Sequence, residues 1–170
     1  MLSMNLYACL SDNKYFCRRS IGRRKMSPSE LLKPTLYAAE GTAAVPDHPA
    51  LHGGKCTCGH VFFPMQTYGC EVCGRNGDAL QPLRLSGRGK LIATATVHIH
   101  AGKPPKPEVK PHEVPFTIGS IALEDGPTVR TLLVGVAGKA LKPGTAMVAT
   151  LVPVGTGAAS ILDLRFTPAS

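Results

Sequence analysis

The chain has 170 residues, of which 44% are hydrophobic and 18% are charged, so it can bury the core of one domain or of two small ones. Its 18 glycines and 15 prolines exclude a helix bundle and favour short strands joined by turns. No apolar run approaches the roughly 20 residues of a membrane-spanning helix, which excludes an integral membrane protein. The first residues lack a basic region followed by an apolar stretch, so we expect no secretory signal and a cytoplasmic location.

The formal net charge of +8 is concentrated near the first residue. Residues 1–26 hold six basic side chains and one acidic side chain, which gives +5 and leaves +3 for the rest of the chain. A capping box over residues 27–30 follows, with serine as N-cap, proline next and glutamate three positions on. Three interpretations of residues 1–26 stay open: a translated stretch before a natural start at Met26, an organelle transit peptide, or a nucleic-acid-binding arm. We expect Cys9 and Cys17 to be inert.

Residues 27–54 are predicted to form a lead-in with little regular structure. A short helix is expected from Pro28 to Lys33, where Pro34 ends it. A short turn is expected over Leu36–Glu40. Glycines and prolines follow, up to Gly53-Gly54, and they predict an irregular path to the first paired cysteine.

Apolar and polar residues alternate in several runs between residues 84 and 168. The expected strands are Lys90–His100, Val114–Leu123, Thr128–Val136, Ala146–Val154 and Ile161–Phe166. Gly102–His112 holds four prolines and is predicted to be a loop. Five short strands with one long interruption favour an OB-fold barrel over residues 84–168, with a β-sandwich as the alternative. His98 and His100 are expected to be a solvated pair.

Four cysteines lie in two close pairs, Cys56 with Cys58 and Cys70 with Cys73. Two such pairs can converge on one tetrahedral metal ion, and a glycine follows each pair, where a knuckle turn needs positive φ. Thiolates favour Zn²⁺, and a full Cys₄ shell leaves no open position for water or substrate. We therefore expect one structural zinc ion in a rubredoxin-like ribbon over residues 55–80.

Three other interpretations of these cysteines stay open. Iron could occupy the same four thiols, as it does in rubredoxin-like sites. His60 could replace Cys56 as a ligand, because a gap of one residue is tight for chelation by Cys56 and Cys58. The four thiols could also lie close together without binding any metal.

Motifs in the ribbon and the barrel carry a family resemblance. They are Cys58–Pro64, Tyr68–Gly74, Gly87–Leu91, Ile121–Pro127 and Leu164–Pro168. With them, residues 45–168 resemble the family of rubredoxin-type zinc-ribbon plus OB-fold proteins, long labelled a domain of unknown function, whose members accompany thiolases and other acyl-CoA enzymes. The chain departs from many members by the single residue inside its first cysteine pair and by the lack of a tryptophan-containing helix before the ribbon.

The resemblance implies a mostly β protein with an irregular or helical lead-in, a zinc ribbon and a five-stranded OB-fold barrel. It also implies a non-catalytic subunit that forms a hetero-oligomer with a thiolase-fold large subunit. A thiolase needs an activated nucleophilic cysteine, and the ribbon cysteines are assigned here to metal, so we expect no catalytic residue in this chain. The reaction implied for the complex is thiolytic cleavage of a 3-oxoacyl-CoA, with benzoylsuccinyl-CoA as a candidate substrate.

The resemblance further implies coenzyme A, or an acyl-CoA, at a site shared with the partner. Its phosphates would need basic side chains, which the chain offers at the ribbon–barrel junction and in the proline-rich loop. The candidates are Arg84, Arg88, Lys90, Lys103, Lys106 and Lys110. The alternative is that these are solvated surface charges. Phe62, Phe63 and Pro64 are expected to form a ribbon core or, second, a partner contact.

Two other functions are weighed against this one. The same family includes partners of hot-dog-fold acyl-CoA hydratases, and the sequence does not separate that partner from a thiolase. A nucleic-acid-binding module would need exposed aromatic residues among basic ones on the barrel strands. Phe116 is the only aromatic residue between Lys90 and Val136, so nucleic acid is not the expected partner.

Overall fold

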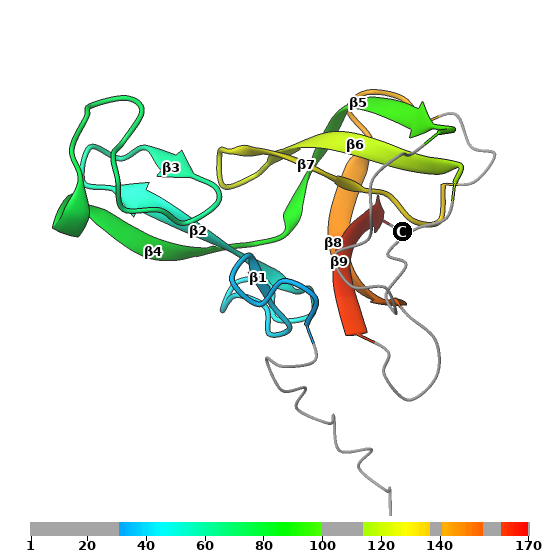
Figure 1. The fold of residues 1–170 in the computed structure, drawn as a ribbon, viewed down its shortest axis with the longest axis horizontal. Helices are drawn as coiled ribbons and strands as arrows, with labels where there is room; N and C mark the ends of the chain where they lie inside the picture. Colours follow the sequence, from blue (N-terminus) through cyan, green and yellow to red (C-terminus); the bar gives the residue numbers. More distant parts are fainter. Residues whose placement is uncertain (1–30, 100–113, 137–140, 155–160, 170) are drawn as a thin grey trace, which may run out of the picture.

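The computed structural model describes residues 31–99, 114–136, 141–154 and 161–169. It contains a small antiparallel sheet that carries the ribbon, followed by a curled five-stranded sheet (Figure 1). The described chain is mostly β, as predicted. Among the described residues, no helix has the length and apolar character that a membrane span requires.

The first sheet is organised around one central strand, β2. Antiparallel pairing joins β2 to β1, to β3 and, over six residue pairs, to β4. A short 3₁₀ helix, Gly77–Ala79, precedes β4. The strands of this sheet are β1 (Tyr37–Ala38), β2 (Ala50–Cys56), β3 (Val61–Phe62) and β4 (Leu80–Leu85).

The prediction of an irregular path at Gly53 and Gly54 is wrong, because both glycines lie inside β2. A Cβ atom at Gly54 would overlap the ring of Phe62, and one at Gly53 would stand 2.7 Å from the Leu85 side chain. The two glycines therefore allow the Phe62 ring and Leu85 to pack directly on the β2 backbone. With Cys56, Phe62 belongs to a small buried cluster in the ribbon, so the core interpretation of Phe62 is confirmed.

The lead-in also differs from its prediction. Leu36–Glu40, expected to be a turn, contains the two residues of β1, and residues 31–33 are not helical. Leu31 instead forms an isolated parallel bridge with Leu162. The Tyr37 hydroxyl donates to the Leu162 carbonyl at 3.1 Å, so the lead-in is attached to the last strand of the barrel. The rest of the expected helix lies outside the described residues.

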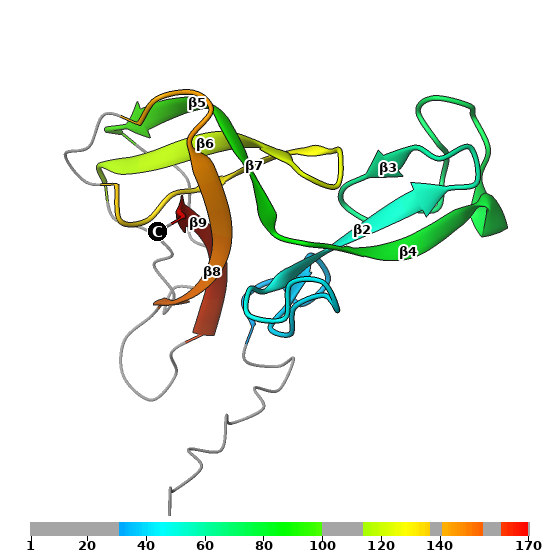
Figure 2. The same cartoon turned by 180° about the vertical axis from the view of Figure 1, so that it is seen from behind.

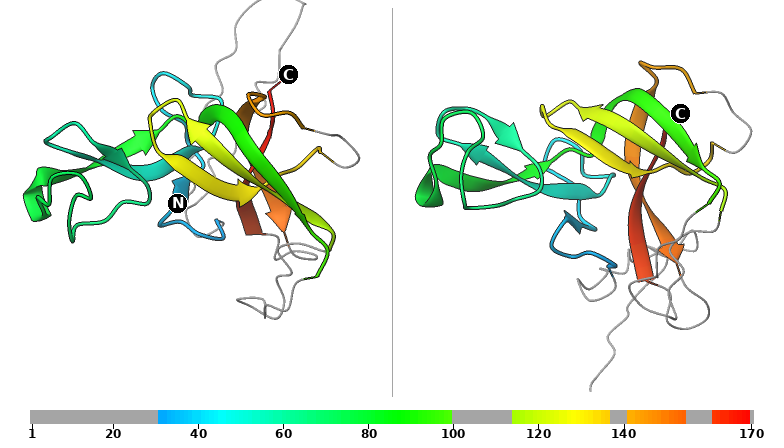
Figure 3. Two further views of the ribbon diagram at one scale, coloured as in Figure 1. Left: turned by 90° about the horizontal axis from the view of Figure 1, so that it is seen from above. Right: turned by 45° about the horizontal axis from the view of Figure 1, so that its top comes forward.

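The second sheet confirms the five expected strands to within a few residues at their ends. Its order is β7-β6-β5-β8-β9. A parallel bridge between Leu133 and Phe166 joins the two outer strands, and the Val134 N–H donates to the Phe166 carbonyl at 2.9 Å. This closure curls the sheet as in an OB-fold barrel (Figure 3). The strands are β5 (Arg88–Val97), β6 (Phe116–Leu123), β7 (Thr128–Leu132), β8 (Ala146–Val154) and β9 (Ile161–Pro168).

One hydrophobic core joins the two sheets. Leu51 and Leu85 of the first sheet belong to the same buried cluster as Leu91, Ile121 and Phe166 of the second. The far end of the ribbon, with its two cysteine knuckles, extends away from the barrel (Figure 2). The barrel therefore anchors one end of the β2–β4 pair, while the other end presents the cysteines.

Candidate metal centre

The structure brings all four predicted cysteines together. Their Sγ atoms lie within 4.8 Å of one another, with 3.5 Å between Cys56 and Cys73 and 3.8 Å between Cys58 and Cys70. A tetrahedron of sulfurs at about 2.3 Å from a zinc ion has edges of about 3.8 Å, whereas a disulfide bond is about 2.05 Å long. The four thiols are free, and their spacing fits one metal ion.

Two backbone knuckles position these cysteines. The N–H of Gly59 donates to the carbonyl of Cys56, and the N–H of Gly74 donates to the carbonyl of Cys70, each at 2.8 Å. Gly59 has a φ of +95° and Gly74 a φ of +73°, so the predicted need for positive φ after each pair is confirmed. Each pair therefore folds locally into a turn that directs its two sulfurs to one side.

The sulfurs lie close enough together to shift the pKa values of one another's thiols. The backbone N–H of Cys58 is the main cause that lowers the pKa of Cys56 to about 6, and the backbone N–H of Cys73 lowers the pKa of Cys70. Although the backbone N–H of Arg75 lowers the pKa of Cys73, burial and the three other sulfurs raise it to about 12. Four thiolates this close repel one another, and a bound divalent cation removes that repulsion.

The donor set fits a structural metal ion. Four soft thiolates complete a tetrahedral shell and leave no position for water or substrate. Cys56 and Cys70 are buried, whereas Cys58 and Cys73 are exposed, so the ion would lie at the ribbon surface. His60 is not in this group, and its Nε2 lies 2.8 Å from the Glu71 carboxylate.

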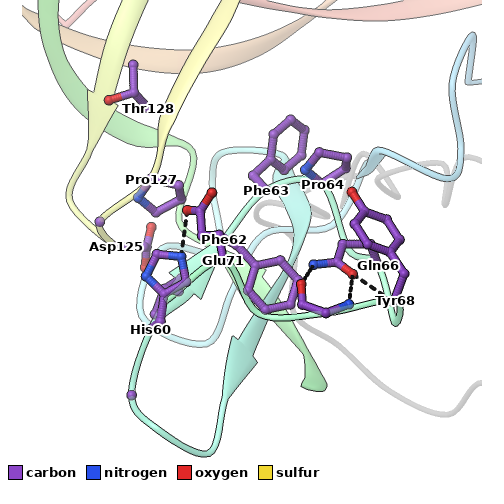
Figure 4. Close-up of a pocket in the computed structure, with 14 residues that line it drawn as sticks. His60, Phe62, Phe63, Pro64, Gln66, Tyr68, Glu71, Asp125, Pro127 and Thr128 are labelled. Carbon is purple, nitrogen blue, oxygen red and sulfur yellow. Dashed lines mark hydrogen bonds and ion pairs between the residues drawn. The ribbon is translucent and has the colours of Figure 1, made fainter. Parts of the chain in front are cut away.

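A pocket of about 710 Å³ lies between the ribbon and the barrel (Figure 4). The ribbon side includes Phe63, Pro64 and Tyr68, together with the pair of His60 and Glu71, and the barrel side is the β6–β7 turn. The described lining contains no lysine or arginine. Sequence reasoning did not find this pocket, although the family motifs on its two sides, Cys58–Pro64 and Ile121–Pro127, were the available signal.

The Asp125 carboxylate holds the turn at Ser86-Gly87, which joins β4 of the first sheet to β5 of the second. Oδ2 of Asp125, in the β6–β7 turn, accepts hydrogen bonds from the backbone N–H of Ser86 at 2.7 Å and from its hydroxyl at 2.6 Å. Ser86 is buried and Gly87 has a φ of +67°. A Cβ atom at Gly87 would stand 2.6 Å from the Pro49 carbonyl oxygen and 2.9 Å from the Ala149 side chain, so this turn requires glycine.

The predicted coenzyme A contacts lie in separate places. Arg84 is opposite His52 in the β2–β4 register and lines a second pocket, of about 250 Å³, against the lead-in. Burial, and then the nearby Arg84 charge, lower the pKa of His52. Arg88 and Lys90 are both exposed and two residues apart on β5, and the Arg88 Nε lies 3.9 Å from the Glu124 carboxylate. Lys103, Lys106 and Lys110 lie outside the described residues.

The remaining predicted residues are divided between core and surface. Phe63 is half-buried and packs against the main core, and Pro64 is exposed. His98 is exposed, and His100 lies outside the described residues. Cys9 and Cys17 lie outside them as well.

Comparisons with known proteins support the family resemblance. Residues 84–152 match the family described as ChsH2, C-terminal OB-fold domain. A DUF35 domain-containing scaffold protein of Pyrococcus furiosus is 32% identical over 94 residues, which is 55% of this chain and 62% of that protein. A protein of the same description from Methanocaldococcus jannaschii is 32% identical over 77 residues, which is 45% of this chain and 49% of that protein.

A solved structure shares the fold. It is a chain of an Ltp2-ChsH2(DUF35) aldolase, with a TM-score of 0.52 and 22% identity, over 71% of this chain and 86% of that chain. The chain spans less than two thirds of the length of the two scaffold proteins that it matches. Together the matches support an OB-fold of the ChsH2 C-terminal or DUF35 type.

Proposed function

We propose that this chain is a non-catalytic accessory subunit of a thiolase-type acyl-CoA complex and holds one structural zinc ion. The observation that carries the proposal is a closed four-sulfur site on a ribbon attached to a DUF35-type OB-fold. The chain is similar to scaffold proteins and shares its fold with a chain of an aldolase. A subunit that organises a larger enzyme complex accounts for these features together. We place this complex in the cytoplasm.

Cys56, Cys58, Cys70 and Cys73 would hold the zinc ion. When bound, zinc would cross-link the two knuckles. It would not act as a Lewis acid on a substrate, because four thiolates complete its coordination shell. The same sulfurs could hold iron. Metal analysis and the absorption spectrum distinguish the two ions, since zinc thiolate sites are colourless and ferric ones are not.

Catalysis is assigned to the partner. A thiolase nucleophile must be a thiolate that can attack an acyl group, with a base nearby. All four described cysteines take part in the sulfur cluster, so none of them meets this need. The large subunit would supply the nucleophile, and the complex would cleave a 3-oxoacyl-CoA, with benzoylsuccinyl-CoA as the candidate substrate.

Arg88 and Lys90 are the residues that we propose for coenzyme A phosphates. Both are exposed on β5, directly after the Ser86-Gly87 turn that joins the two sheets. The pocket between ribbon and barrel suits phosphates poorly, because Glu71 and Asp125 are the charged residues of its described lining apart from His60. Arg84 would contact coenzyme A only if the ligand also reached the pocket that Arg84 lines with residues of the lead-in.

The proposal is tested by purifying the chain from its native host with its bound proteins and identifying the large partner. A thiolase-fold partner is expected. A hot-dog-fold hydratase would replace the thiolase assignment, and recovery with nucleic acid alone would contradict both. The chain alone is expected to show no thiolysis of any 3-oxoacyl-CoA, and turnover by the isolated chain would contradict the non-catalytic role.

Charge reversal tests the coenzyme A residues in the reconstituted complex. Arg88→Glu together with Lys90→Glu is expected to raise KM for coenzyme A more than it lowers kcat, and to weaken the salt dependence. Arg130→Glu is the matched control, because Arg130 is exposed on β7 and should leave KM unchanged. An unchanged KM in the double variant would remove this residue assignment and leave the partner assignment intact.

A further inference from the structure

Half of β5 has one edge without a partner among the described residues. β8 pairs with β5 only from Arg88 to Lys90, and the turn before β8 bonds to Leu91. Ile92 is skipped by the pairing, and from Ala93 to Val97 β5 pairs, among the described residues, with β6 alone. β8 turns away at this point while β6 stays beside β5 (Figure 1). In such an edge, every other residue directs its N–H and C=O outward.

A shift in register marks the start of this free edge. The pairing of β5 with β6 skips one residue between Leu91 and Ala93. Leu91 is 2% exposed, whereas Ile92 is 47% exposed. Ala93 to Thr96 are all exposed, so the expected alternation of buried and exposed residues along this strand ends at Leu91. The β5 segment from Ile92 to Val97 thus lies outside the barrel core.

The composition of this edge is unusual for one left in water. Proteins protect free edges with charged residues or proline, because an open edge pairs with other chains. β4, the longest of the edge strands of the first sheet, follows this rule with Pro82 and Arg84. Ile92–Val97 contains neither charge nor proline and consists of isoleucine, alanine, threonine and valine. The isoleucine, the two threonines and the valine are residue types that are enriched in strands.

We propose that Ile92–Val97 pairs antiparallel with the same edge of a second copy of this chain, about a two-fold axis. A two-fold axis perpendicular to the sheet and beside Ala95 sets Ala95 opposite its own copy. It then sets Thr94 opposite Thr96 and Ala93 opposite Val97, twice each. Threonine pairs are favourable across strands, and no like charges meet. The edge is therefore complementary to itself.

This self-association goes beyond the accessory role, and the two can fail separately. It joins two barrels through one continuous sheet and leaves the ribbon knuckles free. An accessory chain of this kind would bring two copies of its large partner into one assembly. The partner could still bind a monomer of this chain if the edge proved unpaired.

The first test measures the mass of the metal-loaded full chain by sedimentation equilibrium over a concentration series. A reversible dimer is expected. Ala95→Lys places two positive charges opposite each other at the axis and should raise the dimer dissociation constant at least tenfold. Gln81→Lys, on the exposed face of β4, is the matched control and should leave the dissociation constant unchanged. A monomer throughout, or a dimer that Ala95→Lys does not weaken, would overturn the proposal.

The second test fixes the register without depending on a destabilising change. Residues directly opposite in an antiparallel pair have Cα atoms about 4.5–5.5 Å apart, which a disulfide can span. The metal-loaded Ala95→Cys variant should therefore form a covalent dimer under mild oxidation, whereas Gln81→Cys should not. Equal cross-linking of both variants, or none in Ala95→Cys, would contradict the two-fold axis beside Ala95. Capture of this edge by residues 100–113 of the same chain would appear as a monomer and would also overturn the proposal.

Discussion

Replacing Asp125 by alanine is expected to loosen the turn between ribbon and barrel. The change removes the acceptor of two hydrogen bonds, from the Ser86 N–H at 2.7 Å and the Ser86 hydroxyl at 2.6 Å. A hydrogen bond to a charged group contributes roughly 1.5–3 kcal/mol. The hydroxyl can turn to another acceptor, but the buried N–H has only limited access to water. We therefore expect a loss of about 3 kcal/mol in the free energy of unfolding.

Two further variants divide this loss into its parts. Ser86→Ala removes the hydroxyl and keeps the N–H bond, so it should cost about 1.5 kcal/mol. In the Asp125→Ala background the same change should cost less, because the carboxylate partner is already absent and the hydroxyl keeps only the long bond from the Arg88 N–H, at 3.4 Å. The difference between the two values is the coupling between Ser86 and Asp125.

The assay is urea unfolding of the metal-loaded chain with the free zinc concentration held constant, because metal binding adds to the measured stability. Glu124→Ala is the matched control. Glu124 is the neighbouring acid, and its ion pair with Arg88 is exposed and 3.9 Å long, so its loss should cost at most about 0.5 kcal/mol. A loss below about 1 kcal/mol for Asp125→Ala, or an equal loss for Glu124→Ala, would refute the reasoning.

Three more predictions concern the metal, the ribbon core and the lead-in. Purified protein should contain about one zinc ion per chain, measured by mass spectrometry of the metal. Cys70→Ser or a chelator should unfold the ribbon, because the metal joins its two knuckles. Metal-free protein with a folded ribbon would contradict this prediction. Gly54→Val should lower the free energy of unfolding by about 1–3 kcal/mol, because its side chain overlaps the Phe62 ring, and a change within 0.5 kcal/mol in urea unfolding would speak against that packing. Burial, and then Asp163, raise the pKa of Tyr37 from 10.0 to about 12. The proton is thus held more tightly in the folded chain, and the stability that it contributes is present below pH 10 and lost as the pH rises to about 12. Tyr37→Phe should lack this part of the pH dependence in denaturant unfolding, and an identical profile would contradict it.

The sequence by itself determined the elements that depend on near neighbours. Two close cysteine pairs, each followed by glycine, predicted the knuckles because a turn of a few residues fixes where its own sulfurs point. The strand Ala146–Val154 was predicted at its observed bounds, since alternation of apolar and polar residues is a local property of a strand. Both patterns are complete within a short stretch of chain.

Only the tertiary structure decided how distant segments meet. Gly53-Gly54 looks like a break in the sequence, yet it lies in a strand because Phe62 and Leu85 pack on its backbone. Tyr37 reaches Leu162, 125 residues away, and gives the lead-in its place on the barrel.

The same limit applies to the candidate sites. The pocket and the Asp125–Ser86 contact join ribbon and barrel residues that no local pattern relates. Among the described residues, the free edge of β5 arises because β8 leaves β5 after Lys90, so the alternation that predicted this strand could not show which of its edges would be paired. A periodic sequence specifies a strand and its two faces, whereas the neighbours along its edges are chosen by packing of the whole chain.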